Sequence, residues 1–176
     1  MQGIIQERLS FKDGERTVSM DLPTRWSFRS SPARLELIPA VQFASGSVDA
    51  SQLESPQPPW DENALKALTQ QVLANVPPSS SDVAVVTEQQ NTVVLDGRIP
   101  SFEVVVSYQI LGQAFRRATI FINLPDTQLI CRFTAPQGDF DSLSGAFRRS
   151  INSWAWSEAK PDTVAAPAAA APLAQP

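Results

Sequence analysis

Five arginines between residues 116 and 149 carry the side chains best suited to recognising another molecule. They are Arg116, Arg117, Arg132, Arg148 and Arg149. Each guanidinium is permanently charged and planar, so it pairs with a carboxylate or another anion through parallel hydrogen bonds. Because neighbouring residues of a strand point to opposite faces, Arg116 and Arg117 are expected on different sides of a sheet. The chemistry that this set predicts is recognition of an anionic group.

We predict a partner-binding surface made of four of these arginines and one aromatic side chain. Its members are Arg116, Arg132, Arg148, Arg149 and Trp156. An acidic protein surface or a bound anion would suit the arginines, and a tryptophan ring commonly anchors a partner. A simpler interpretation stays open, in which the arginines are scattered over a solvated surface and the tryptophan covers an edge of the core.

Groups that could perform catalysis are few. The chain has no histidine, which excludes an imidazole base, a serine–histidine triad and histidine metal ligands. Its single cysteine, Cys131, alternates with apolar residues and is expected to be a buried structural thiol. Asp139 and Asp141 are expected at a helix N-terminus, where a carboxylate is favoured, rather than as an acid–base pair. We therefore predict a protein that is not an enzyme and that has no cofactor and no metal site.

The size and composition of the chain fit one domain. It has 176 residues, of which 43% are hydrophobic, and a formal net charge of −4. The acidic balance and the lack of a glycine-rich phosphate-binding loop argue against nucleic acid as a partner. No segment is apolar enough for a membrane span. The expected partner is another protein. The start of the chain lacks the apolar region of a signal peptide, which predicts a cytoplasmic protein, although an exported mature form would look the same.

Two segments have the spacing of amphipathic helices. In residues 62–76, leucines and valines recur every three or four positions, prolines flank the segment, and Asp61 is placed to cap its N-terminus. In residues 139–156, Asp139 or Asp141 would be the cap. The apolar stripe of this second segment consists of Phe140, Leu143, Phe147, Ile151 and Trp154. Each helix should therefore bury one face.

Most other segments predict a largely antiparallel sheet. Residues rich in β-branched and aromatic side chains occupy positions 17–22, 27–30, 34–41, 82–89, 92–95, 102–111, 113–124 and 127–134. Turns at Asp96-Gly97, Gly112 and Pro125-Asp126 are short enough to make the strands that they join antiparallel. Residues 45–59, rich in Ser, Pro and Gln, are expected to form an exposed connection. The order of elements indicates an α+β fold with helices laid against a sheet.

The end of the chain is expected to lie outside the fold. Residues 158–176 are mostly alanine and proline and offer little that could be buried against a core. We predict one domain over residues 1–157, followed by a disordered tail or a linker at 158–176.

Four stretches of the sequence resemble one known family. They are DLPTRW at 21–26, DGRIPSFEVVVSY at 96–108, CRFTAP at 131–136 and DFDSLSGAFRRSINSW at 139–154. On these residues, the chain from 16 to 156 is similar to the PsbP-like superfamily, which includes PsbP subunits of photosystem II, Mog import factors and bacterial DcrB-like proteins. The resemblance implies an α/β/α sandwich, with a mostly antiparallel sheet flanked by two main helices, that works by binding other proteins.

Three functions stay open, and the first is favoured. It is a non-enzymatic, protein-binding accessory or chaperone-like domain of bacterial type, as the resemblance implies. The alternative is a small-molecule or lipid carrier with a cavity between sheet and helices, where Val105 and Ile130 would line an apolar trough on an open sheet face. The least supported is an enzyme that uses carboxylates and arginines alone, because no pair of these residues has convincing spacing for such chemistry.

Overall fold

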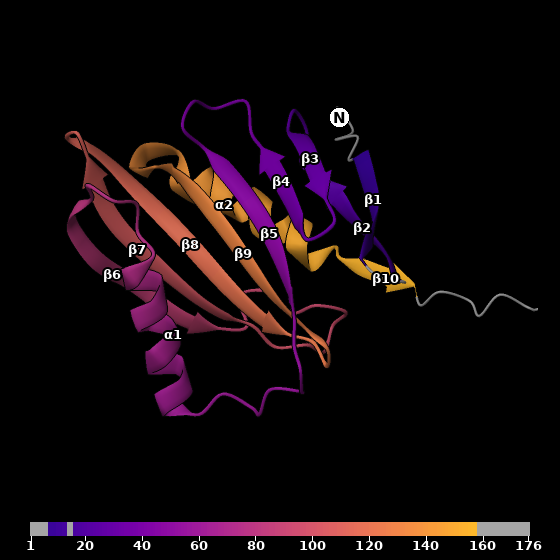
Figure 1. Cartoon of the computed structure of the whole chain (residues 1–176). Helices are drawn as coiled ribbons and strands as arrows, with labels where there is room; N and C mark the ends of the chain where they lie inside the picture. The colour runs from indigo at the N-terminus through magenta and orange to yellow at the C-terminus, as the bar shows by residue number, and fades with distance from the viewer. Residues whose placement is uncertain (1–6, 14–15, 158–176) are drawn as a thin grey trace, which may run out of the picture.

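Ten strands and two helices make up the described part of the chain, residues 7–13 and 16–157 of a computed structural model (Figure 1). The strands are β1 (Glu7–Asp13), β2 (Arg16–Leu22), β3 (Ser27–Ser31), β4 (Arg34–Ile38), β5 (Ser45–Gln52), β6 (Ser81–Gln90), β7 (Phe102–Ile110), β8 (Gln113–Asn123), β9 (Thr127–Pro136) and β10 (Ala155–Ser157). The helices are α1 (Glu62–Ala74) and α2 (Gln137–Asn152). The tail predicted at residues 158–176 lies outside the described residues.

The main sheet has seven strands in the order β3-β4-β5-β9-β8-β7-β6, and every neighbouring pair is antiparallel. A second, three-stranded sheet has the order β1-β2-β10 and is also antiparallel. Between β7 and β8, Leu111 and Gly112 have φ angles of 50° and 78°, the left-handed pair that a two-residue hairpin needs. The predicted α+β fold, with two helices flanking a largely antiparallel sheet, is confirmed.

Side chains that alternate along the strands fill two separate cores, one on each face of the main sheet. On the first face, the sheet packs against α2 and the three-stranded sheet. The buried residues of this larger core include Met20, Leu37, Val48, Ile120, Phe133 and Phe147. On the second face, a smaller core joins Val72 of α1 to four residues of β7, which are Phe102, Val104, Val106 and Tyr108. In Figure 1, α1 accordingly lies in front of the sheet and α2 lies behind it.

A close contact in the larger core lies between α2 and β5. Phe147 of α2 sits directly over Gly46 of β5, where an added Cβ would lie 2.8 Å from the Cε2 atom of the phenyl ring. The ring of Phe133 on β9 packs beside it, with ring centroids 5.3 Å apart. Trp26 stacks on Phe133 at 5.7 Å between centroids. The glycine at position 46 therefore lets the helix approach the sheet closely.

Helix α1 covers only part of the second face. Its N-terminus is capped as the sequence predicts, because the Asp61 carboxylate accepts a hydrogen bond from the Ala64 amide at 2.8 Å. The helix packs on β6 and β7. In the described part of the chain, no helix covers the half of this face that β4, β5 and β9 form (Figure 1).

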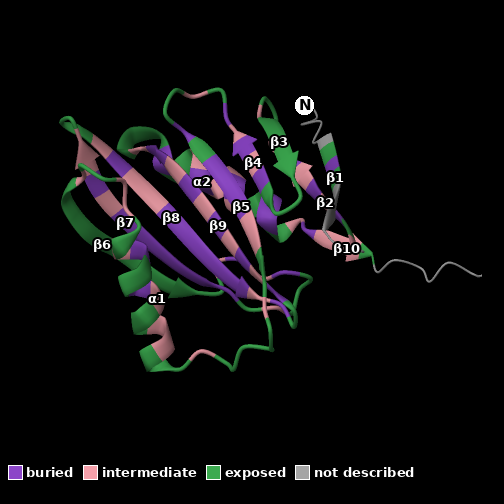
Figure 2. Cartoon of the chain, viewed as in Figure 1, coloured by how far each residue is buried: buried purple, intermediate pink, exposed green. Residues whose placement is uncertain are grey.

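Burial follows this layered arrangement (Figure 2). Along β9, buried residues alternate with half-buried ones, because one side of this strand faces the large core and the other faces the open half of the sheet. All ten residues of β6 are exposed, since this strand forms one edge of the main sheet and pairs only with β7.

The prediction of an exposed connection at residues 45–59 is wrong for its first half. Ser45–Gln52 forms β5, an interior strand that pairs with both β4 and β9. Its residues are small, so the alternation of apolar and polar side chains that is typical of a strand is not visible in the sequence. On the core side of Gly46, the space is filled by the rings of Phe133 and Phe147. The irregular connection to α1 comprises residues 53–61.

The predicted limits of the second helix also need correction. Helix α2 ends at Asn152, so Trp154 lies beyond it, although this tryptophan is buried as expected. The N-cap is Pro136, and no side chain, including those of Asp139 and Asp141, provides a capping hydrogen bond. Strand β9 runs directly into the helix at this proline, whose ring fixes φ at a value compatible with a helix start.

Residues 92–95 do not form the predicted strand. Asp96 and Gly97 have positive φ angles of 51° and 64°, as expected of a tight turn, but this turn closes only a single bridge between Leu95 and Ile99. The loop bends toward the large core, where Val93 and Leu95 are buried. The regular hairpin is formed by β6 and β7 on either side of the loop.

Replacing Gly46 tests the close approach of α2 to the sheet. The new Cβ of Gly46→Ala would lie 2.8 Å from Phe147 Cε2 and 3.2 Å from Phe133 Cδ2. We expect the free energy of unfolding in urea to fall by about 1–3 kcal/mol, the usual effect of overpacking. Gly138→Ala in α2 is the matched control, because nothing lies within 4 Å of its new Cβ. Equal stability of the two variants would contradict the proposed contact.

Candidate functional site

The arginines that the sequence predicts as one set lie on both faces of the main sheet. On β8, Arg116 faces α2, where its Nη1 lies 3.7 Å from Oδ1 of Asp141. Arg117 faces the opposite side, where its Nη1 donates to the Asn75 carbonyl at the end of α1. Arg132 of β9 lies on the same side as Arg117, because its neighbours Cys131 and Phe133 point into the large core. Arg132 therefore lies across the sheet from Arg116.

Arg148 of α2 is held by an internal ion pair. Its Nε and Nη2 donate to the two carboxylate oxygens of Glu103 on β7, at 2.8 and 2.9 Å. The Glu103 side chain is only 1% exposed. Ser144 accepts a further bond from Arg148 at 3.3 Å. The main role of this guanidinium in the structure is thus to neutralise a buried carboxylate and to tie α2 to the sheet.

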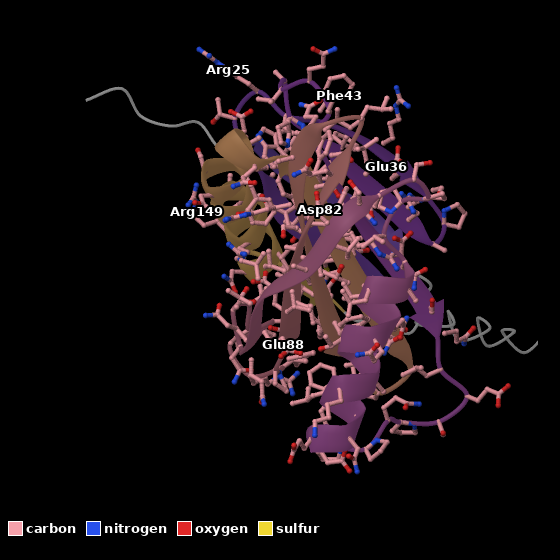
Figure 3. All side chains as sticks on the ribbon, turned by 90° about the vertical axis from the view of Figure 1, so that its left-hand side faces the viewer. Arg25, Glu36, Phe43, Asp82, Glu88 and Arg149 are labelled. Atoms are coloured by element: carbon pink, nitrogen blue, oxygen red, sulfur yellow. The ribbon has the colours of Figure 1, made fainter. Side chains whose placement is uncertain are left out.

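Arg149 and Trp156 lie apart from the other predicted site residues. Arg149 is exposed on α2, on the opposite side of the molecule from Glu36 of β4 (Figure 3). Trp156 lies on β10, opposite Val18 of β2, and packs partly buried against the large core. The structure therefore does not bring the five predicted residues into one patch, and a partner-binding role for each of them stays a prediction.

The residues considered as catalytic candidates are a thiol in the core and two carboxylates on the surface of a helix. Cys131 is fully buried in the large core, and burial raises the pKa of its thiol to about 12. Asp139 and Asp141 are exposed on α2. Among residues 7–13 and 16–157, no three His, Cys, Asp or Glu side chains are grouped to hold a metal ion. Within the same ranges, neither helix is long and apolar enough to cross a membrane.

A polar hollow of about 490 Å³ lies on the half of the second face that no described helix covers. We call it the arginine hollow. Strands β4, β5, β8 and β9 and the end of α1 contribute its lining, which includes Arg34, Glu36, Ser47, Arg117, Arg132 and Thr134. These residues meet because alternate positions of each strand point to the same face. The hollow thus collects three guanidinium groups from three different strands.

Two of these guanidiniums share one carboxylate. Asp49 of β5 accepts from Arg34 Nη1 at 2.8 Å and from Arg132 Nη1 at 3.3 Å. Ser47 donates to Asp49 at 3.3 Å, and Arg34 Nε lies 3.3 Å from Glu36 Oε1. These contacts fix Arg34 and Arg132 on the open face and compensate part of their charge.

Arg117 is fixed differently, by neutral groups. Its Nε donates to Thr134 Oγ1 at 2.9 Å, and its Nη1 donates to the Asn75 carbonyl at 3.0 Å. The guanidinium carbon lies 5.7 Å from the centre of the Tyr108 ring, a cation–π distance. In the described ranges of the chain, Arg117 forms no ion pair. Among the described residues, the hollow therefore contains one oriented cation without a charged partner.

Part of this site was not predicted from the sequence. Arg34 was not among the grouped arginines, and Asp49 lay in the segment predicted as a loop. The available signal was the alternation of polar residues, Arg34 with Glu36 in one segment and Ser47 with Asp49 in the next. It becomes readable only when residues 45–52 are recognised as a strand.

The arrangement of strands and helices is similar to that of two solved structures. Cyanobacterial PsbP (CyanoP) from Synechocystis matches with a TM-score of 0.62 and 11% identity, over 88% of this chain and 94% of that one. LpqN of Mycobacterium tuberculosis, involved in cell envelope biogenesis, matches with a TM-score of 0.56 and 16% identity, over 87% of this chain and 92% of that one.

The chain has a PsbP-like fold. The resemblance read from the sequence is thus confirmed at the level of the fold. No family model matches the chain, and no curated protein matches its sequence. At identities this low, the likeness extends to the fold alone.

Removing the cation of the Glu103–Arg148 pair tests its structural role. Arg148→Met leaves the buried Glu103 carboxylate without its cation. We therefore expect the free energy of unfolding in urea to fall by about 3–5 kcal/mol. Glu103→Leu with Arg148→Met should be less destabilised than the sum of the single variants. Arg149→Met is the control, because this neighbouring arginine is exposed, and it should change stability by less than about 0.5 kcal/mol. Equal losses in Arg148→Met and Arg149→Met would rule out a structural role for the pair.

The buried thiol gives a further prediction. The pKa of Cys131 is raised to about 12 from an ordinary value of 9.0 because the side chain is fully buried. A thiol reagent such as DTNB at pH 8 should therefore leave the native protein unmodified, because both the thiolate and access to it are lacking. In urea, the same thiol should react completely within minutes. Rapid labelling of the native protein would show that Cys131 is accessible.

Proposed function

We propose that this chain is a non-enzymatic accessory or chaperone-like domain that binds another protein through the arginine hollow. The observation that carries the proposal is Arg117, a cation oriented by Thr134, Asn75 and the Tyr108 ring with no described carboxylate beside it. A guanidinium held in this way loses little conformational entropy when it meets an anionic group. Such a group on a protein surface is a natural ligand for it.

The position of the hollow supports a binding role. It lies on a sheet face that α1 leaves open, so a segment of a partner can approach without displacing an element of the fold. The backbone beneath it is rigid, because β5, β8 and β9 are interior strands paired on both sides. Side chains fixed on paired strands provide a preorganised surface, which reduces the cost of association.

The chemistry of the described residues supports a role other than catalysis. The cysteine is buried with a raised pKa, and the carboxylate of Asp49 beside the hollow is engaged by two arginines. Glu36 is paired with Arg34. These groups lack the pairing of a nucleophile with a base that covalent or acid–base catalysis needs.

The similar structures are compatible with this proposal. One is a PsbP protein, and the other is described as involved in cell envelope biogenesis, which names a process and no reaction. A carrier function has no comparable support. Val105 and Ile130, the expected lining of an apolar trough, point to opposite faces of the sheet, since the first lies in the large core and the second packs against the smaller core.

Affinity capture from a lysate of the native organism tests the proposal. The full chain is the bait, and Arg117→Ala and Arg132→Ala are used as separate variant baits beside Arg98→Ala, which removes an exposed arginine outside the hollow. We expect one protein to be retained by the wild-type chain and by Arg98→Ala, and to be reduced about tenfold or more with either variant of the hollow. Thermal melting of each bait first establishes that it is folded.

Two results would count against the proposal. If no protein is retained above background by the folded wild-type bait, the binding function fails. If a protein is retained equally by all four baits, binding occurs, but the hollow is not the surface that performs it.

A further inference from the structure

We propose that the arginine hollow binds a side-chain carboxylate on an acidic, extended segment of the partner protein, with Arg117 and Arg132 as its two cationic contacts. This inference rests on the proposed binding function and specifies the chemistry of the partner. It is carried by the free hydrogen-bonding capacity of Arg117, by the spacing of the two arginines and by the mixed charge around them.

Arg117 has donors left for a ligand. A guanidinium carries five N–H groups, and the contacts of Arg117 use its Nε and one position on Nη1. Three donors therefore remain, one on Nη1 and two on Nη2, and they can pair with a carboxylate. The bonds to Thr134 and Asn75 fix the plane of the guanidinium, so these remaining donors are already oriented.

Arg132 is a diagonal neighbour of Arg117 on the same face of the sheet. Arg117 pairs in register with Thr134 across β8 and β9, and Arg132 is two residues farther along β9 on the same face. Such diagonal neighbours lie about 7–8 Å apart, within reach of each other's long side chains. The single contact of Arg132 with Asp49, at 3.3 Å, leaves most of its donors free. Both guanidiniums line the hollow.

The mixed charge of the hollow favours a carboxylate over a phosphate. Glu36 lies in the lining, and Asp49 bonds to two of its arginines, so three cations are opposed by two anions. A doubly charged phosphate would be repelled by both carboxylates, whereas a single carboxylate adds one negative charge next to Arg117. A peptide also brings amide groups, for which the hydroxyls of Ser47 and Thr134 are suitable partners.

The size of the hollow fits a short peptide segment. Its volume of about 490 Å³ is in the range of sites that hold small ligands. An extended segment can therefore place its acidic side chain between the two arginines while its backbone crosses the open strands.

Fluorescence anisotropy with a defined probe tests this inference. The probe is a labelled hexapeptide of alternating Glu and Ala with blocked ends, and the matched peptide carries Gln in place of Glu. We expect the full chain to bind the Glu peptide at low salt and the Gln peptide at least about tenfold more weakly. Arg117→Ala and Arg132→Ala should each weaken the Glu peptide about tenfold or more, whereas Arg98→Ala should match the wild type.

A conservative variant and two competitors complete the design. Arg117→Lys keeps the charge but loses the two-pronged geometry, so it should weaken the Glu peptide several-fold while the melting temperature stays near that of the wild type. Acetate should displace the peptide at a lower concentration than inorganic phosphate. Displacement by phosphate at the lower concentration would overturn the carboxylate assignment, and so would equal binding of the two peptides.

The outcomes separate this inference from the function on which it rests. Capture of a partner that depends on the hollow, together with failure of the Glu peptide, would overturn the acidic-segment inference and leave the binding function in place. Failure of capture would remove the binding function itself, whatever the peptide does.

Discussion

The packing of Phe147 over Gly46 is the contact on which the arrangement of the layers depends. Because β5 carries no side chain at this point, α2 can approach the sheet until its phenyl ring meets that of Phe133, at 5.3 Å between centroids. The helix thereby lies across β8 and β9, and the three-stranded sheet packs on the same face of the main sheet. The other main helix lies on the opposite face, over β6 and β7, where Val104 and Val106 supply the apolar residues. The remainder of that face stays open.

Two arginines show that the role of a charged side chain depends on its position relative to the layers of the fold. Arg148 lies between α2 and the sheet, where the buried carboxylate of Glu103 takes two of its bonds. A pair in such a position holds elements together, and breaking it leaves an uncompensated charge in the core. Arg117 lies on the other face, where neutral oxygens orient it and no described carboxylate neutralises it. The same side chain is therefore structural in one layer and available to a ligand in the other.

Much of the fold could be predicted from the sequence, because local signals are strong where one strand follows another. The hairpin at Gly112, the helix after Asp61 and the alternation around Cys131 all depend on near neighbours. The site could be predicted only in part. Its composition depends on the order of strands, which brings Arg34 and Arg132 together across β5 although nearly a hundred residues separate them. No local pattern indicates that pairing.

Strand β5 links the packing of the core to the shape of the hollow. Its short residues serve both faces, since Gly46 admits the ring of Phe147 on one side and Ser45 and Ser47 form part of the lining on the other. Longer side chains on this strand would separate α2 from the sheet and fill the space between Arg34 and Arg132. The feature that made β5 look like a loop, a run of small polar residues, is therefore what produces both the close helix packing and the open polar surface. Because the sheet is continuous through β5, the face that carries the arginine hollow has the rigidity of the core beneath it.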